Sequence, residues 1–148
     1  MTKIKAIFGL LGAVAAAVVL VVSFGAAQAS ASSAPLAFTY EKACDETVGH
    51  CTSSPGARVT LDMQLTSFRA TGSAAQLTFT ERVTVGDVSF TAVLSGQWVG
   101  VPEGFIVLNG TVTGGSFAGA QIHQRSDFVG RLGSVSTWTG ELLLMPAS

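Results

Sequence analysis

The chain has 148 residues, 48% of them hydrophobic, and a formal net charge of −1 at pH 7. Lysine and arginine are neither abundant nor clustered, which excludes the basic footprint of a nucleic-acid-binding protein and an electrostatic membrane-binding patch. The length suits one domain with a single hydrophobic core.

The first 31 residues have the three-part pattern of a secretory signal peptide. Two lysines form a basic start, a long uncharged stretch follows, and small residues then recur at A-x-A spacing. The pattern predicts cleavage after Ala29 or Ala31, an extracellular protein, and a single domain over residues 32–148. The alternative is an uncleaved membrane anchor, because the apolar stretch is long enough to span a bilayer.

The two cysteines, Cys44 and Cys51, lie close together in the sequence. An even count at short spacing in an exported chain predicts a disulfide. The alternative is a metal site that also uses His50, but a fourth ligand is missing and the spacing matches no common zinc pattern. We therefore expect a disulfide and no metal.

After residue 35, apolar and polar residues alternate with a period of two, and no helical period extends over a helix length. Enrichment in Val, Thr and Phe also favours strands. The alternation predicts strands at 36–42, 58–68, 75–85, 88–99, 104–108, 117–128 and 134–145.

Glycine-containing pairs mark the predicted turns. Gly86-Asp87 and Asn109-Gly110 are each expected to form a tight hairpin, and loops are expected at 71–73, 100–104 and 130–133. The fold class is therefore all-β, a small antiparallel barrel of about eight strands, with a β-sandwich as the alternative. A barrel of this size is either filled by side chains or holds one small ligand.

Residues 108–145 read LNGTVTGGSFAGAQIHQRSDFVGRLGSVSTWTGELLLM. This segment resembles the later part of the allene oxide cyclase and dirigent group of β-barrels. The matching positions, with a shorter turn here, are Gly114, Gly115, Phe117, Gly119 and Ala120. The resemblance implies an eight-stranded barrel whose cavity accepts an apolar small molecule and, in the enzymes of the group, steers a cyclisation or coupling by shape. It assigns no catalytic residue.

Glu81 is the strongest candidate for a catalytic residue. Alternation places it on one strand face with Leu77, Phe79 and Val83. A carboxylate that faces an apolar interior tends to have a raised pKa and can act as a general acid or base. The alternative is a β-bulge, or a strand end, that exposes Glu81 to solvent.

His123 and Arg125 lie at alternate positions and share one strand face. Directed inward, His123 would assist proton transfer and Arg125 would bind a ligand's polar group; directed outward, both would be ordinary solvated residues. Tyr40, Trp98 and Trp138 are candidate ligand-binding residues that line a cavity, with core packing as the alternative.

The residues and the resemblance together predict a secreted barrel that binds a small apolar molecule and requires no cofactor. One hypothesis is an allene-oxide-cyclase-like isomerase or cyclase that confines a reactive substrate. The alternatives are a non-catalytic ligand carrier and a filled β domain that acts through its surface. No nucleic-acid partner is expected, nor a membrane after signal cleavage, and oligomerisation stays open.

Overall fold

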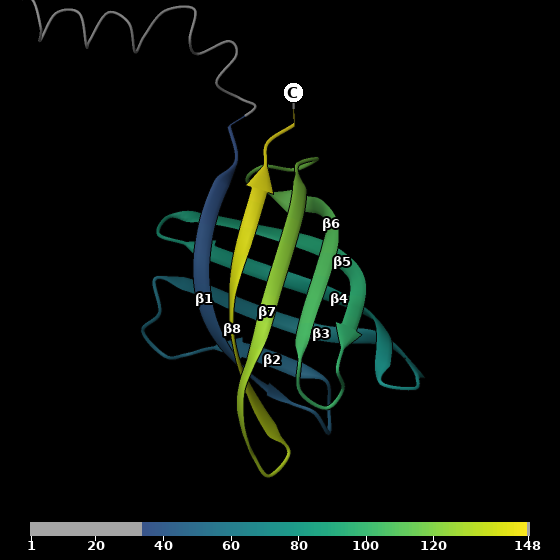
Figure 1. Cartoon of the computed structure of the whole chain (residues 1–148). Coiled ribbons are helices and arrows are strands. Elements are labelled where there is room, and N and C mark those ends of the chain that lie inside the picture. The colour runs from purple at the N-terminus through teal and green to yellow at the C-terminus, as the bar shows by residue number, and fades with distance from the viewer. Residues whose placement is uncertain (1–33, 148) are drawn as a thin grey trace, which may run out of the picture. The chain divides into compact units, whose positions relative to one another are not determined.

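The structure is a computed structural model that describes residues 34–147. The predicted signal peptide and both of its cleavage sites lie outside the described residues. Eight strands follow one another along the chain (Figure 1). They are β1 (Leu36–Asp45), β2 (His50–Ser53), β3 (Val59–Thr71), β4 (Ala74–Val85), β5 (Val88–Val99), β6 (Phe105–Gly115), β7 (Gln121–Leu132) and β8 (Val135–Met145).

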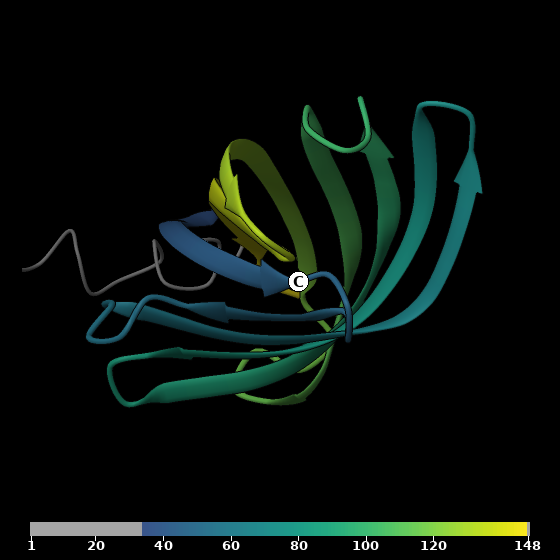
Figure 2. The same cartoon turned by 90° about the horizontal axis from the view of Figure 1, so that it is seen from below.

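The strands close into an antiparallel barrel in sequence order. Each strand pairs with the next, and β1 pairs with β8 from Leu36 opposite Leu144 to Asp45 opposite Val135. The end view in Figure 2 shows the sheet curving round on itself. The predicted all-β barrel is confirmed, and the closed pairing rules out the sandwich.

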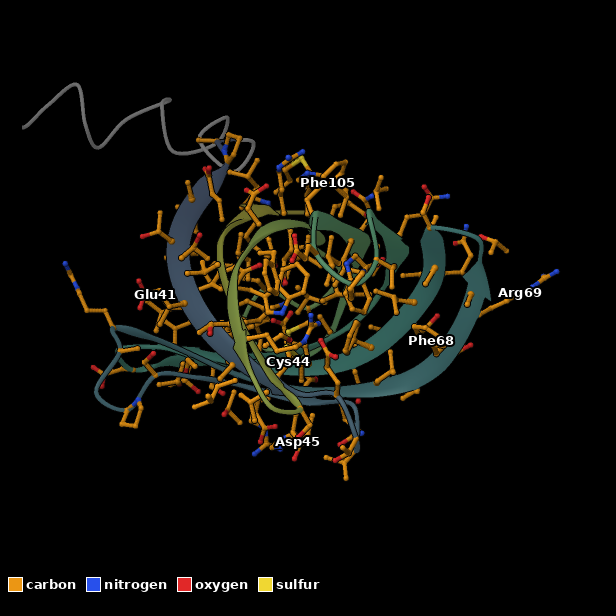
Figure 3. All side chains as sticks on the ribbon, turned by 60° about the horizontal axis from the view of Figure 1, so that its bottom comes forward. Glu41, Cys44, Asp45, Phe68, Arg69 and Phe105 are labelled. Atoms are coloured by element: carbon orange, nitrogen blue, oxygen red, sulfur yellow. A yellow bond between two sulfur atoms is a disulfide. The ribbon has the colours of Figure 1, made fainter. Side chains whose placement is uncertain are left out.

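Alternation along the strands builds the core. In β4, Leu77, Phe79, Glu81 and Val83 are buried while the residues between them are not. The same pattern on the other strands fills the barrel with large side chains. Figure 3 shows Glu41 and Arg69 pointing away from the barrel interior. The largest fully buried apolar side chains are Trp138, Phe90, Met63, Leu94, Leu108, Ile122, Leu142 and Leu144.

The predicted turns at 71–73, 86–87 and 100–104 are confirmed. The loop predicted at 130–133 is wrong, because β7 continues to Leu132 and the turn lies at 133–134. The hairpin predicted at Asn109-Gly110 is also wrong. Both residues lie inside β6, where Gly110 pairs with Leu94 and Ile122. A Cβ on Gly110 would collide with the backbone carbonyl of Val93 on β5. This glycine therefore permits a close approach of two strands, not a turn.

The turn between β6 and β7 lies at residues 116–119, within the segment that carries the family resemblance. Phe117 adopts a positive φ of 64° there, and its ring packs edge-on against Phe90 at a centroid distance of 6.2 Å. Strand β7 accordingly begins at Gln121, later than predicted, and continues to Leu132.

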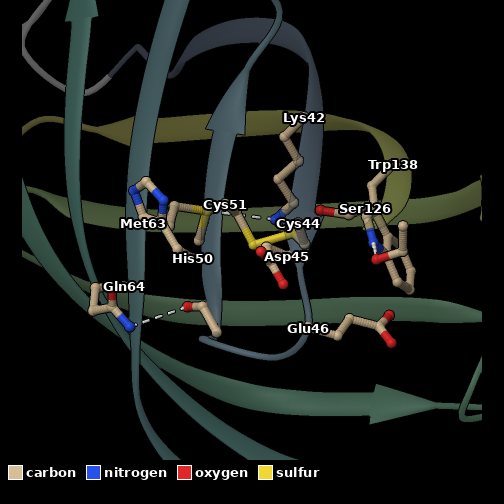
Figure 4. The surroundings of a disulfide bond; sticks show 12 residues. Lys42, Cys44, Asp45, Glu46, His50, Cys51, Met63, Gln64, Ser126 and Trp138 are labelled. Carbon is tan, nitrogen blue, oxygen red and sulfur yellow. Dashed lines mark hydrogen bonds between the residues drawn. A yellow bond between two sulfur atoms is a disulfide. The ribbon is translucent and has the colours of Figure 1, made fainter. Parts of the chain in front are cut away.

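The predicted disulfide is confirmed. Cys44 on β1 and Cys51 on β2 are direct cross-strand partners with a Cα–Cα distance of 4.0 Å, and both are buried. Figure 4 shows the bond inside the barrel wall. A buried disulfide is consistent with an extracellular protein, since such bonds persist in oxidising compartments.

In residues 34–147, no helix is sufficiently long and apolar to cross a bilayer. The same residues contain no group of three or more His, Cys, Asp and Glu placed to hold a metal ion.

Candidate functional site

One end of the barrel contains a cavity of about 340 Å³, which we call the interior cavity. The turn after β1 contributes Glu46 to its lining, and the loop after β5 contributes Pro102. Most of its lining is apolar, including Phe68, which is 50% exposed and therefore lies at the rim. The other large apolar side chains of the lining include Leu65, Leu77, Phe79, Trp98, Ile106 and Trp138.

Lys42 is the one charged residue in the lining that is fully buried, with 1% of its surface exposed. Strand alternation directs it inward, next to the disulfide (Figure 4). Its Nζ lies 3.5 Å from Sδ of Met63, a weak acceptor, and 5.5 Å from the centre of the Tyr40 ring. Lys42 forms no ion pair with a carboxylate in the described part of the chain.

Burial lowers the pKa of Lys42 to about 8, and the charge of Glu81 only partly opposes this shift. An ammonium group removed from water loses solvation that a thioether does not replace. The protonated amine of Lys42 is therefore paired only with a weak acceptor, the sulfur of Met63.

Glu81 lies inside the barrel with 3% of its surface exposed, as alternation predicted, and no bulge turns it outward. Nε2 of Gln124 donates to both carboxylate oxygens, at 2.6 and 2.5 Å. Burial raises the pKa of Glu81 to about 7, although the Gln124 hydrogen bond and the Lys42 charge act in the opposite direction. The carboxyl group is thus set to exchange a proton near neutral pH.

A hydrogen-bonded chain holds Gln124 in this orientation. The Tyr40 hydroxyl donates to Oε1 of Gln124 at 3.3 Å and lies 2.7 Å from Oγ of Ser126. Burial raises the pKa of Tyr40, so its phenol remains a donor. Because the amide oxygen faces Tyr40, the amide nitrogen must face Glu81. We call Tyr40, Lys42, Glu81, Gln124 and Ser126 the interior polar belt.

The two tryptophans predicted to bind a ligand both line the interior cavity. Their rings meet edge to face at 5.5 Å. Nε1 of Trp98 donates to the Glu103 carbonyl, and Nε1 of Trp138 donates to Oγ of Ser136. Both indoles therefore have fixed orientations, with their polar atoms satisfied by the protein.

His123 and Arg125 are on the outer face of β7, in keeping with the outward alternative. Nδ1 of His123 lies 2.6 Å from Oδ1 of Asn109, and Arg125 stacks on Phe105 at 4.3 Å. Neither residue reaches the interior cavity. A role for them in chemistry inside the barrel has no geometric support.

Arg125 instead borders a larger hollow of about 1310 Å³ on the outside of the barrel, between β1 and the segment before β3. Glu41, Arg58 and Asp127 line it as well, and all of these side chains are solvated at least in part. Tyr40, predicted to bind a ligand, lines this hollow and not the interior cavity, and its buried hydroxyl is already hydrogen-bonded to Gln124 and Ser126. The interior cavity, smaller but apolar and with a buried amine, is the better candidate site.

Sequence reasoning missed Lys42, Gln124 and Ser126. The signal for Lys42 was present, because Phe38, Tyr40 and Lys42 alternate within a predicted strand. Lysine is seldom fully buried, so the pattern was not extended to it.

No family model matches the chain, and no curated protein or solved structure matches it either.

Proposed function

We propose that this barrel binds a small, mostly apolar molecule in the interior cavity, with the molecule's polar group next to Lys42. The observation that carries the proposal is a cavity of about 340 Å³ that combines an apolar lining with a buried amine. Small-molecule sites are typically concave and mostly apolar, with a few polar groups that orient the ligand.

The size of the cavity limits the ligand. Sites for small molecules range from about 300 to 1,000 Å³, so this cavity accepts a compact molecule or a short acyl chain. The rim residue Phe68 supplies exposed apolar surface at the mouth, where it would contact the outer end of a ligand. Export is part of this proposal, supported by the Cys44–Cys51 disulfide and the signal-like N-terminal pattern.

Tryptophan fluorescence tests the proposal directly, because both tryptophans of the chain line the cavity. Octanol is a suitable neutral probe, and bromo-octanol, with a terminal bromine, quenches indole fluorescence on contact. We expect saturable quenching by bromo-octanol that octanol reverses by competition. Absence of saturable quenching at the solubility limit of the probe would contradict the proposal.

A rim variant and a matched control locate the bound probe. Phe68→Asp removes apolar contact from the mouth and should weaken binding by roughly tenfold, about 1.4 kcal/mol. Val93→Asp makes the same kind of change at an exposed site on the outer face of β5 and should bind normally. Equal affinity in the two variants would place the probe elsewhere.

A second candidate function is an isomerase or cyclase of the allene oxide cyclase type. Two observations favour it: the resemblance at residues 108–145 and the buried Glu81, whose pKa lies near neutrality. Glu81 does not line the interior cavity, however, so binding without turnover needs fewer assumptions. With a reactive epoxide as substrate, Glu81→Gln should abolish enzymatic ring closure while ligand binding persists.

A further inference from the structure

Lys42 is unusual in two respects beyond its burial. It is the only lysine of residues 34–147, and its amine lies inside the barrel and not in solvent. Its only hydrogen-bond partner among these residues is the thioether of Met63. The amine can leave this weak acceptor at little cost, and no carboxylate of the described residues forms an ion pair with it.

We propose that Lys42 captures apolar aldehydes in the interior cavity as a covalent imine. This inference rests on the proposed function, because the aldehyde must first occupy the cavity. The neutral amine attacks the carbonyl carbon and a C–N bond forms. The carbonyl oxygen then leaves as water with both hydrogens of the amine, and a C=N bond remains. The step is neither an oxidation nor a reduction and needs no other reactant.

The charges inside the barrel favour an aldehyde over a carboxylate as the ligand's polar group. Glu81 is already buried in the same interior, and its negative charge stabilises the positive charge of Lys42. A ligand carboxylate would add a second negative charge to a desolvated space, which is costly. An aldehyde is neutral, and the imine that it forms carries one positive charge after its nitrogen takes up a proton from water, so the charge balance with Glu81 is kept.

The surroundings of Lys42 also favour the neutral amine, which is the nucleophile. An amine attacks a carbonyl only in its neutral form, and burial lowers the pKa of Lys42 to about 8. Desolvated lysines are activated in this manner in enzymes that form Schiff bases. The apolar lining next to Lys42 would hold an alkyl chain, and the open mouth allows water to leave.

Reductive trapping tests the proposal on the full chain. The protein is incubated with octanal and cyanoborohydride, which reduces protonated imines, and the attachment site is found by peptide mass spectrometry. We expect one octyl group on Lys42, in several-fold excess over the reference amines, which are the amino terminus and, in chains that retain the N-terminal segment, Lys3 and Lys5. Octanol should suppress the adduct by competition, and unfolding in urea should abolish the preference for Lys42.

Two variants separate covalent capture from binding. Lys42→Arg retains the positive charge but cannot form an imine, and Lys42→Met is a second variant in case arginine disturbs the fold. Both should lose the selective adduct. If bromo-octanol quenches tryptophan fluorescence and octanal reverses the quenching, but Lys42 is modified no more than the reference amines, the imine is refuted and the proposed function stands. If neither probe binds, both proposals fail.

Discussion

Substitution of Glu81 by glutamine tests the unusual electrostatics of the barrel interior. Glu81→Gln preserves the size of the side chain and an acceptor for Nε2 of Gln124, but it removes the titrating group. A carboxyl group buried to 3% exposure is stabilised in its neutral form, because ionisation inside the barrel forfeits hydration.

The magnitude follows from the two pKa values. The ordinary value of 4.5 applies to the unfolded chain, and burial raises the pKa to about 7 in the folded barrel. Between these values the folded state binds more protons than the unfolded state, so the free energy of unfolding falls as the pH rises. Across the window from 4.5 to about 7, the contribution of Glu81 amounts to roughly 3 kcal/mol.

The assay is urea unfolding at a series of pH values, followed by tryptophan fluorescence under oxidising conditions. The wild type should lose stability through this window, whereas Glu81→Gln should lack that loss. Below the window, the two proteins should differ only by about 1 kcal/mol, from altered hydrogen bonding. Glu41→Gln removes a carboxylate from the outer face and should retain the wild-type decline. Parallel profiles for wild type and Glu81→Gln would refute the reasoning.

Three further variants test other parts of the structure. Lys42→Met should move the decline caused by Glu81 to higher pH, because the Lys42 charge lowers the pKa of Glu81. The variant should also lack the gain in stability that the wild type shows from about pH 8 to 10.5, where the unfolded chain binds more protons at Lys42 than the folded barrel does. Urea unfolding at a series of pH values measures both effects. Replacing Cys44 and Cys51 by serine should lower the free energy of unfolding by roughly 2–3 kcal/mol, and an unchanged midpoint in thermal unfolding would contradict this. Gly110→Ala should destabilise the barrel by about 2 kcal/mol or more because its Cβ collides with the β5 backbone, whereas wild-type stability in calorimetry would show that the strands separate freely.

Most of the barrel was predictable because its walls have one buried face and one solvated face. In β4, the period-two pattern around Glu81 determined both the strand and its orientation. Strand β2 was not predictable, because four residues between a turn and a loop are too few to show a period. Gly110 was misread because asparagine followed by glycine is typical of a hairpin, and only the neighbouring strand reveals the close approach.

The site was predictable only in part, for a related reason. Where both strand faces carry polar residues, alternation shows which residues share a face but does not by itself show which face points inward. On β7 the apolar Ala120 and Ile122 favour the face that carries Gln124, which leaves His123 outside. On β1, the burial of Lys42 depends on the apolar barrel that surrounds it, which pairing across the whole sheet creates.

A crystal structure of the protein soaked with bromo-octanol tests the central claim most directly, because anomalous scattering locates the bromine. Ligand binding in the interior cavity predicts a bromine peak next to Trp98 or Trp138, with the hydroxyl end of the probe near Lys42. Bromine only in the surface hollow beside Arg125, or no bromine with the cavity filled by side chains, would contradict the account.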